Sequence, residues 1–280
     1  MESLLDYKKT ILHQLNKPKL EPSPELAYIC GVILGDGYLS ERHYKGHRSN
    51  YLIALSAIDK DFVLTFNRAL CKVIGRPTPY AMDKNKDGRY RVRGQSFILY
   101  RFLRNLRPDF FKPIAESFPA DFIKGIADSE GWVINLKRTR GIGIALTSED
   151  LLHYVQDLLE QHWQILSTIR CRQPDREPAT KKDKSLIYSK KVLYTLSIED
   201  KISLDRFTDN IGFSIQRKQE ALHQAVLSMS EPRSRRWNLK YVIPEIQRLK
   251  AEGLTYQQIS KEVNKSLGTI YQLCPVGGGR

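Results

Sequence analysis

Two segments of the chain share one pattern of apolar residues, glycines and a final acidic residue. The first is PELAYICGVILGDG at residues 24–37, and the second is PADFIKGIADSEG at residues 119–131. Their acidic residues, Asp36 and Glu130, are 130 − 36 = 94 positions apart. Each segment is predicted to form a helix that begins just after a proline and ends at a glycine suited to the C′ position.

The segments that follow each helix repeat as well. LIALS at residues 52–56 resembles GIALT at 143–147, and YRVR at 90–93 parallels YTLS at 194–197. Helical spacing alternates with period-two spacing, so each half predicts the order helix, strand, strand, helix, strand, strand, helix. A repeat that keeps all these parts in order indicates a duplicated unit, because each copy must bury the same pattern of residues.

Small residues lie four apart on both predicted helices. Gly31 and Gly35 occupy the first helix, and Gly125 and Ser129 match them on the second. Residues at this spacing share one helix face and let two backbones approach closely. Glycine inside a helix costs about 1 kcal/mol relative to alanine, so matched glycines favour a packing purpose. We expect the two helices to pack on each other and to form the interface between the halves.

Close packing of these helices would bring Asp36 and Glu130 together at the two C-terminal ends. Unpaired carbonyls and the negative end of each helix dipole lie there too. Such an arrangement repels itself unless a cation is present, and a hard divalent cation with oxygen ligands fits it. A pair of such metals beside two phosphodiesters could activate water and stabilise the leaving oxygen.

These residues resemble a known family, the LAGLIDADG homing endonucleases, in the form that carries two motifs on one chain. The resemblance covers about residues 24–227, because the repeat agrees as well as the motifs. Two copies at this separation are far more specific than one. The matching residues are Gly31, Asp36 and Gly37 with Leu34 and Gly35 as common variants, and Gly125, Asp128, Glu130 and Gly131 with Ser129 at the small position.

The resemblance implies an α+β fold of two pseudo-symmetric αββαββα halves, whose antiparallel sheets form a saddle that lies in the major groove of DNA. It also implies that Asp36 and Glu130 ligate Mg²⁺, two or more ions at a shared site, with help from the carbonyls of Gly35 and Ser129. Water would attack one phosphate on each strand across the minor groove and leave 3′ overhangs.

The family also places basic and polar residues around the metals, but these follow no tight motif. Lys218 or Arg217, before the last helix of the second half, and Lys60 in the first half are the candidates. Ser56 and Thr147 occupy the polar position at the end of the second strand of each half. They could order water or merely finish a strand.

The charge of the chain points to a polyanion partner. Of its 280 residues, 45 are Lys or Arg and 31 are Asp or Glu, which gives a formal net charge of 45 − 31 = +14. Such an excess supplies much of non-specific nucleic-acid binding. No apolar run approaches 18 residues, so no membrane-spanning helix and no membrane partner are expected. With the resemblance, we expect a monomer bound to double-stranded DNA at a long, weakly symmetric site.

Polar residues on the predicted strands support a groove-binding surface. Arg89, Arg91 and Arg93 alternate, so all three project from one face of a strand. Arginine can bind guanine through two hydrogen bonds, and Asn or Gln can bind adenine in the same way. For about half of these residues a phosphate contact or a solvated position is the alternative. The candidates are Tyr38, Ser40, Arg42, Tyr44, Lys45, Arg48, Asn50, Arg89, Arg91, Arg93, Asn135, Lys137, Arg138, Arg140, Arg170, Arg172 and Gln173.

A separate piece follows the second half. Thr255 is a good N-cap, and the surrounding sequence resembles a helix-turn-helix of the resolvase type, after a helix expected at residues 241–252. A small three-helix packing module is the alternative. In the helix-turn-helix interpretation, the recognition helix would carry Ser266, Thr269 and Gln272 outward. The expected division is an N-terminal extension at 1–23, a first half at 24–118, a second half at 119–227, a linker at 228–236 and the helix-turn-helix-like module at 237–280.

The leading functional hypothesis is a site-specific double-strand DNA endonuclease, a Mg²⁺-dependent hydrolase of phosphodiester bonds encoded by an intron or a similar mobile element. One alternative is a transcription regulator that binds DNA through a non-catalytic LAGLIDADG fold, and another is an RNA maturase. The N-terminal residues MESLLDYKKTILHQL show neither a signal peptide nor a transit peptide. The expected location is the cytoplasm of a prokaryote or an organelle.

Overall fold

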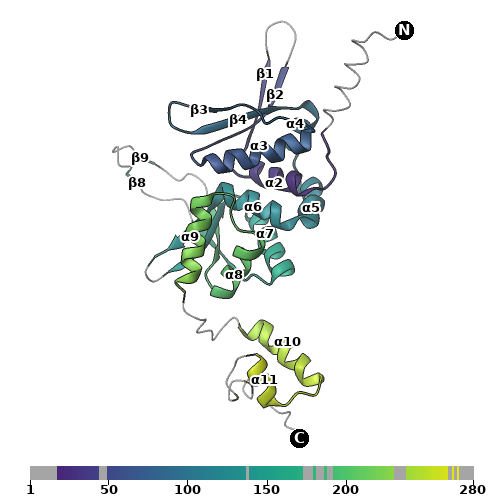
Figure 1. Ribbon diagram of the computed structural model, residues 1–280, viewed down its shortest axis with the longest axis vertical. Helices are drawn as coiled ribbons and strands as arrows, with labels where there is room; N and C mark the ends of the chain where they lie inside the picture. The colour runs from purple at the N-terminus through teal and green to yellow at the C-terminus, as the bar shows by residue number, and fades with distance from the viewer. Residues whose placement is uncertain are drawn as a thin grey trace, which may run out of the picture. The chain divides into compact units, whose positions relative to one another are not determined.

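The computed structural model of this protein divides the chain into two compact units, Met1–Met229 and Ser230–Arg280, each of which is described by itself (Figure 1). The residues whose structure is described are 18–43, 49–136, 139–172, 179–180, 186–187, 192–229, 238–263, 267 and 270.

The first half of the larger unit is a helix pair, a four-stranded antiparallel sheet and two closing helices. The strand order is β1-β2-β4-β3. One face of the sheet is covered by helices, and the buried Ile53, Leu55 and Val92 lie on that face. The elements are α2 (Pro24–Ile33), β1 (Tyr38–His43), β2 (Ser49–Ala57), α3 (Lys60–Ile74), β3 (Met82–Lys84), β4 (Tyr90–Gln95), α4 (Phe97–Arg104) and α5 (Pro108–Ser117).

The second half repeats this plan with the strand order β5-β6-β10-β7. A short two-stranded sheet of β8 (Ala179–Thr180) and β9 (Leu186–Ile187) lies between β7 and β10 in the sequence. The other elements are α6 (Pro119–Glu130), β5 (Gly131–Asn135), β6 (Arg140–Leu146), α7 (Glu149–Trp163), β7 (Thr168–Arg172), β10 (Leu193–Ile198), α8 (Lys201–Asn210) and α9 (Gln216–Leu227).

The predicted order of a helix, two strands, a helix and two strands is confirmed in the first half, and the second half inserts β8 and β9 between its last two strands. The prediction of a single closing helix is wrong, because each half ends in two helices. The fold is α+β, and its two antiparallel four-stranded sheets form the two-half saddle that the family resemblance implies. Among the described residues, no helix is long and apolar enough to cross a membrane.

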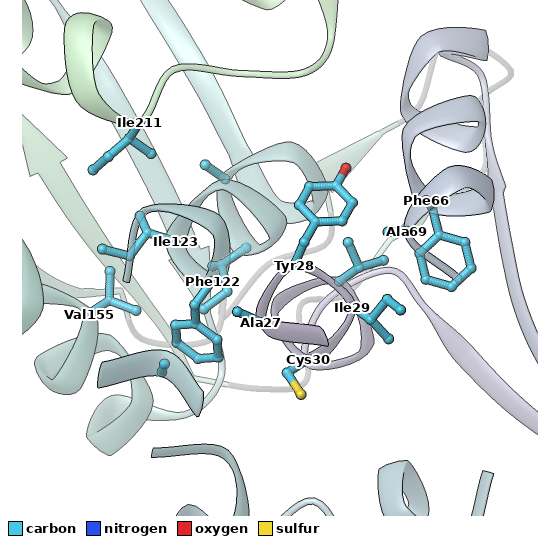
Figure 2. Packing of buried hydrophobic residues seen from close by; sticks show 14 of the residues in the cluster. Ala27, Tyr28, Ile29, Cys30, Phe66, Ala69, Phe122, Ile123, Val155 and Ile211 are labelled. Carbon is cyan, nitrogen blue, oxygen red and sulfur yellow. The ribbon is translucent and has the colours of Figure 1, made fainter. Parts of the chain in front are cut away.

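The two halves meet at α2 and α6. A Cβ atom on Gly31 would lie 2.3 Å from the carbonyl oxygen of Phe122, and one on Gly125 would lie 2.4 Å from that of Tyr28. Neither position therefore has room for a side chain, and the predicted contact between the helices is confirmed. Figure 2 shows Tyr28 and its neighbours on α2 between Phe122 of α6 and Phe66 of α3. Because α2 is covered on several sides, the whole stretch from Leu26 to Val32 is buried.

The helix ends differ from the prediction. Both helices begin at their proline rather than after it, and neither ends in a left-handed glycine. Gly131 is extended, with φ of −94° and ψ of 153°. A Cβ atom there would lie 2.5 Å from the carbonyl oxygen of Ala127, and one on Gly37 would lie 2.8 Å from Ile33 Cδ1. The glycines are needed for space, because the chain turns back against its own helix as it enters the first strand of each half.

The smaller unit contains α10 (Asn238–Ala251) and α11 (Tyr256–Glu262). The hydroxyl of Thr255 accepts a hydrogen bond from the Gln258 backbone N–H, and the Gln258 side chain accepts one from Thr255, so the predicted N-cap is a full capping box. The buried residues here include Ile246, Leu249 and Ile259. The predicted recognition-helix residues Ser266, Thr269 and Gln272 lie outside the described residues.

The close approach of α2 and α6 predicts the effect of Gly31→Ala. Helix propensity alone would stabilise the protein by about 1 kcal/mol. Overpacking against the Phe122 backbone should instead lower the unfolding free energy by about 1–3 kcal/mol. Urea denaturation measures the difference, with Gln161→Ala, at an exposed position of α7, as the control. A Gly31→Ala variant more stable than the wild type would contradict the contact.

Candidate functional site

The carboxylates of Asp36 and Glu130 are delivered by the adjoining ends of α2 and α6. The turn after α2 is held by hydrogen bonds from the N–H groups of Gly35 and Gly37 to the carbonyl oxygen of Val32, at 3.1 and 2.8 Å. A Cβ atom on Gly35 would lie 3.0 Å from Glu130 Cγ. The residue before Asp36 thus packs directly on Glu130, and the structure brings the two acidic residues together.

The electrostatics of the pair are those of two neighbouring like charges at the edge of the core, where Asp36 is exposed and Glu130 is half-buried. Burial raises the pKa of both carboxyls, and the charge of Asp36 raises the pKa of Glu130 further. Lys218 opposes both shifts, and Arg89 lowers the pKa of Asp36. A cation between the carboxylates would relieve this repulsion.

The donor set suits a hard divalent cation. Besides the carboxylates, the Ser129 hydroxyl lies at the contact between the helices and donates to the Gly125 carbonyl oxygen at 2.9 Å, so its own oxygen keeps its lone pairs. No cluster of three or more His, Cys, Asp or Glu side chains suited to a metal is found among the described residues. A cation here would therefore complete its shell with carbonyls, waters or phosphate oxygens, as Mg²⁺ commonly does.

Of the three basic candidates, Lys218 is the one that the structure places beside both carboxyls. It lies in the first turn of α9 rather than before the helix, and its side chain is buried. Its Nζ donates to the backbone carbonyl oxygens of Ala127 at 3.2 Å and Asp128 at 2.7 Å, near the C-terminal end of α6. Burial lowers the pKa of Lys218, and the charge of Asp128 opposes that shift.

The other two basic candidates have different surroundings. Arg217 forms a two-pronged ion pair with Asp59, with Nε at 2.6 Å and Nη2 at 2.7 Å from the carboxylate oxygens. The neighbouring Gln216 N–H donates to Asp61 at 2.5 Å, so α9 is tied to the start of α3 in the first half. Lys60 is exposed between these two acids. Of the three, Lys218 is the one whose charge acts on both site carboxyls.

Sequence reasoning missed the role of Asp128. This carboxylate is 2% exposed and accepts hydrogen bonds from the Tyr28 hydroxyl at 2.8 Å, the Ser214 N–H at 2.9 Å and the Ser214 hydroxyl at 2.5 Å. Ser214 lies just before α9, so Asp128 anchors the segment that delivers Lys218. The matching position in the first half, 128 − 94 = 34, is Leu34, whose side chain cannot accept hydrogen bonds. The second half therefore has this anchor and the first half lacks its counterpart.

Strand register places several predicted DNA-contacting residues on one face of the first sheet. Tyr38 pairs with Ala54 and Ala54 with Arg93, while Ser56 pairs with Arg91. Partners across a sheet share a face and neighbours along a strand alternate. The face opposite the helices therefore carries Tyr38, Ser40, Asn50, Arg91 and Arg93. Arg42 of β1 lies at the backbone position that pairs with Asn50. Arg89 is exposed and lies just before β4, which begins at Tyr90.

The second sheet presents fewer of the predicted residues. Arg170 pairs with Thr195, and Arg172 with Leu193, on the face opposite the buried Leu196. Asn135 is exposed at the end of β5 and pairs with Arg140, whose Nε donates to the Ser228 hydroxyl at 2.5 Å. The Arg140 guanidinium is therefore engaged beside α9. Outside the described residues lie Tyr44, Lys45, Arg48, Lys137, Arg138 and Gln173.

Comparison with known proteins identifies the family. A family model described as a LAGLIDADG-like domain matches residues 117–212, which contain α6 and the second sheet. The uncharacterized protein MJ0398 of Methanocaldococcus jannaschii is 34% identical over 235 residues, which cover 82% of each chain. This chain belongs to the LAGLIDADG family. A second relative from that organism, the uncharacterized protein MJ0314, is 32% identical over 160 residues, which cover 54% of this chain and 59% of that protein.

A solved structure shares the fold. The crystal structure of I-DmoI in complex with DNA and Ca is 22% identical, with a TM-score of 0.50, and the match covers 72% of this LAGLIDADG chain and 97% of that one. At this identity the likeness shows the two-half fold alone, and the function has to be argued from the site.

The Asp128 anchor predicts a large loss of stability in Asp128→Ala. Three donors lose their acceptor, and an unsatisfied buried donor costs about 1–3 kcal/mol. The unfolding free energy should fall by at least that amount in urea denaturation. Asp157→Ala, which removes an exposed carboxylate on α7, should change it by less than about 0.5 kcal/mol. Equal effects of the two substitutions would rule the anchor out.

Proposed function

We propose that this protein is a site-specific, metal-dependent endonuclease that cuts both strands of DNA and leaves 3′ overhangs, in support of the homing of an intron or similar element. The observation that carries the proposal is the pair of neighbouring carboxylates, the exposed Asp36 and the half-buried Glu130, beside the buried Lys218. Two repelling carboxylates at a contact between helices have no evident structural purpose. Membership of the LAGLIDADG family supports the same conclusion.

In this proposal Asp36 and Glu130 hold two or more divalent cations, with Mg²⁺ as the physiological ion and with the carbonyls of Gly35 and Ser129 as further ligands. The relatives of known structure support a divalent ion, because I-DmoI has been crystallised with DNA and Ca or Mn. When bound, the cations supply an activated water and stabilise the leaving oxygen.

Lys218 contributes a positive charge that is fixed in place. Its ammonium has three N–H donors, two of which are directed at the carbonyls of Ala127 and Asp128. The remaining N–H can donate to a phosphate oxygen, whose negative charge grows in the transition state. The Asp128 anchor and the ties of α9 to α3 hold the lysine so that little reorganisation is needed during the reaction.

The DNA would lie across the outer faces of the two sheets. The row of Arg89, Arg91 and Arg93 on the first sheet and Arg170 with Arg172 on the second supply charge and hydrogen-bond donors. Because the halves share a backbone plan but differ in these side chains, the target is long and only weakly symmetric, and one chain as a monomer supplies both halves. A net charge of +14 should make the affinity strongly salt-dependent.

A second candidate is a DNA-binding regulator that does not cut. The observation in its favour is the separate C-terminal unit, whose α10 and the capped α11 are compatible with a helix-turn-helix. The two functions differ in one measurable property, which is cleavage.

Cleavage tests the carboxylate pair. Supercoiled plasmid with the uninterrupted insertion site should be linearised with Mg²⁺ and left intact with EDTA. Asp36→Asn or Glu130→Gln should abolish cutting while DNA affinity persists, because the substitutions remove metal ligands and not groove contacts. Asp157→Asn, at an exposed carboxylate, is the matched control. Wild-type protein that binds this site and never cuts it would support the regulator.

Lys218→Met tests the basic residue. The substitution keeps most of the unbranched side chain and removes its charge, so the single-turnover cleavage rate should fall about 100-fold with little change in DNA affinity. Lys60→Met is the matched comparison, because Lys60 is exposed, and it should alter the rate less than tenfold. A larger effect at Lys60 than at Lys218 would transfer the role to Lys60.

A further inference from the structure

One carboxylate on the outer face of the first sheet holds two of the arginines proposed to contact DNA. Asp83 of β3 lies directly opposite Arg91 of β4. Its Oδ1 accepts from Arg91 Nε at 3.2 Å and its Oδ2 from Arg91 Nη2 at 2.6 Å. Arg93 Nη2 donates to the same Oδ2 at 3.2 Å. The two guanidinium groups are therefore fixed by a single acidic residue.

Stability gives little reason for this arrangement. The Asp83 side chain is 45% exposed, Arg91 is 31% exposed and Arg93 is 42% exposed. Ion pairs this exposed typically contribute about 0–1 kcal/mol. The pairing lowers the pKa of Asp83 and raises that of Arg91, so both stay charged at neutral pH.

The charge of Asp83 also works against binding to a polyanion. A carboxylate on a basic surface cancels part of the attraction for phosphates, so it lowers sequence-independent affinity. Any benefit of Asp83 to DNA binding must therefore come from the orientation that it gives to the two arginine side chains. The neighbouring Arg89 acts on the pKa of Asp36, so this row of arginines begins beside the proposed cutting centre.

The hydrogen bonds leave a defined edge of Arg91 available. Asp83 occupies Nε and one hydrogen of Nη2, which are on one side of the planar group. A guanidinium has five N–H donors, so Nη1 and the second hydrogen of Nη2 still point outward as a parallel pair. That pair matches the O6 and N7 acceptors of guanine in the major groove.

We propose that Asp83 is a specificity-determining positioning residue, which fixes Arg91 in the orientation that recognises a guanine in the target DNA. The inference rests on the proposed DNA-binding function and adds a base and a residue to it. Fixing the Arg91 guanidinium in the free protein reduces the side-chain entropy that is lost when the guanine is bound. The same carboxylate accepts a hydrogen bond from Arg93 and so holds that side chain beside Arg91 on the same face of β4.

The substitution Asp83→Asn tests the proposal because it changes two affinities in opposite directions. It should weaken the preference for guanine, since an amide has one acceptor oxygen and cannot accept from both Nε and Nη2 of Arg91. It should strengthen binding to random duplex, since a negative charge is lost. Asp87→Asn is the matched control. It removes an exposed negative charge from the turn between β3 and β4, whereas the hydrogen bonds to Arg91 come from Asp83. It should strengthen random binding and leave the preference intact.

The experiment uses the full chain in EDTA, so that nothing is cut. A preferred duplex is selected from a random library, and Kd is measured for that duplex, for versions with each G·C pair changed to A·T, and for random duplex. For the wild type, one change should weaken binding about 10–100-fold. That ratio should fall below about threefold in Asp83→Asn and in Arg91→Ala, with all variants showing the thermal unfolding of the wild type.

Three outcomes would overturn the inference. If Asp83→Asn keeps the full guanine preference, Asp83 does not position Arg91, and the proposed nuclease function is untouched. If affinity falls equally for the selected and the random duplex, Asp83 only supports its strand. If the wild-type protein binds no duplex at all, the proposed function fails and this inference fails with it.

Discussion

At Gly31 and Gly125 the backbones of α2 and α6 lie so close that a single methyl group on either would collide with a carbonyl oxygen of the other helix. This contact joins two halves that each carry their own sheet, and it merges their interiors into one hydrophobic core. It also aligns the C-terminal ends of the two helices, so that Asp36 and Glu130 lie side by side where the chain leaves them. The site is therefore a consequence of helix packing.

Around this shared centre the halves are similar in backbone and unequal in polar groups. Tyr28 on α2 corresponds to Phe122 on α6 at the offset of 94, and Leu34 corresponds to Asp128. The tyrosine and the aspartate bind each other across the interface and hold the start of α9. One half thus provides the anchor and the lysine for a pair of carboxylates that both halves supply.

The sequence predicts the contact between the helices and the meeting of the acids, because glycines four apart identify a helix face and the repeat identifies its partner. It does not predict how the helices end, since a glycine there can mean either a left-handed residue or a lack of space, and space decides at Gly131. Nor does it predict the partners of Asp128 and Asp83. Ser214 is 86 residues from Asp128, and Asp83 faces Arg91 only through strand register.

The most direct measurement is the anomalous scattering of Mn²⁺ in crystals of the full chain with its DNA site. The shared-site account predicts at least one ion that is bound by a carboxylate oxygen of Asp36 and one of Glu130, each at about 2.0–2.6 Å. Ions that contact only one of these residues, or that lie elsewhere on the protein, would contradict it.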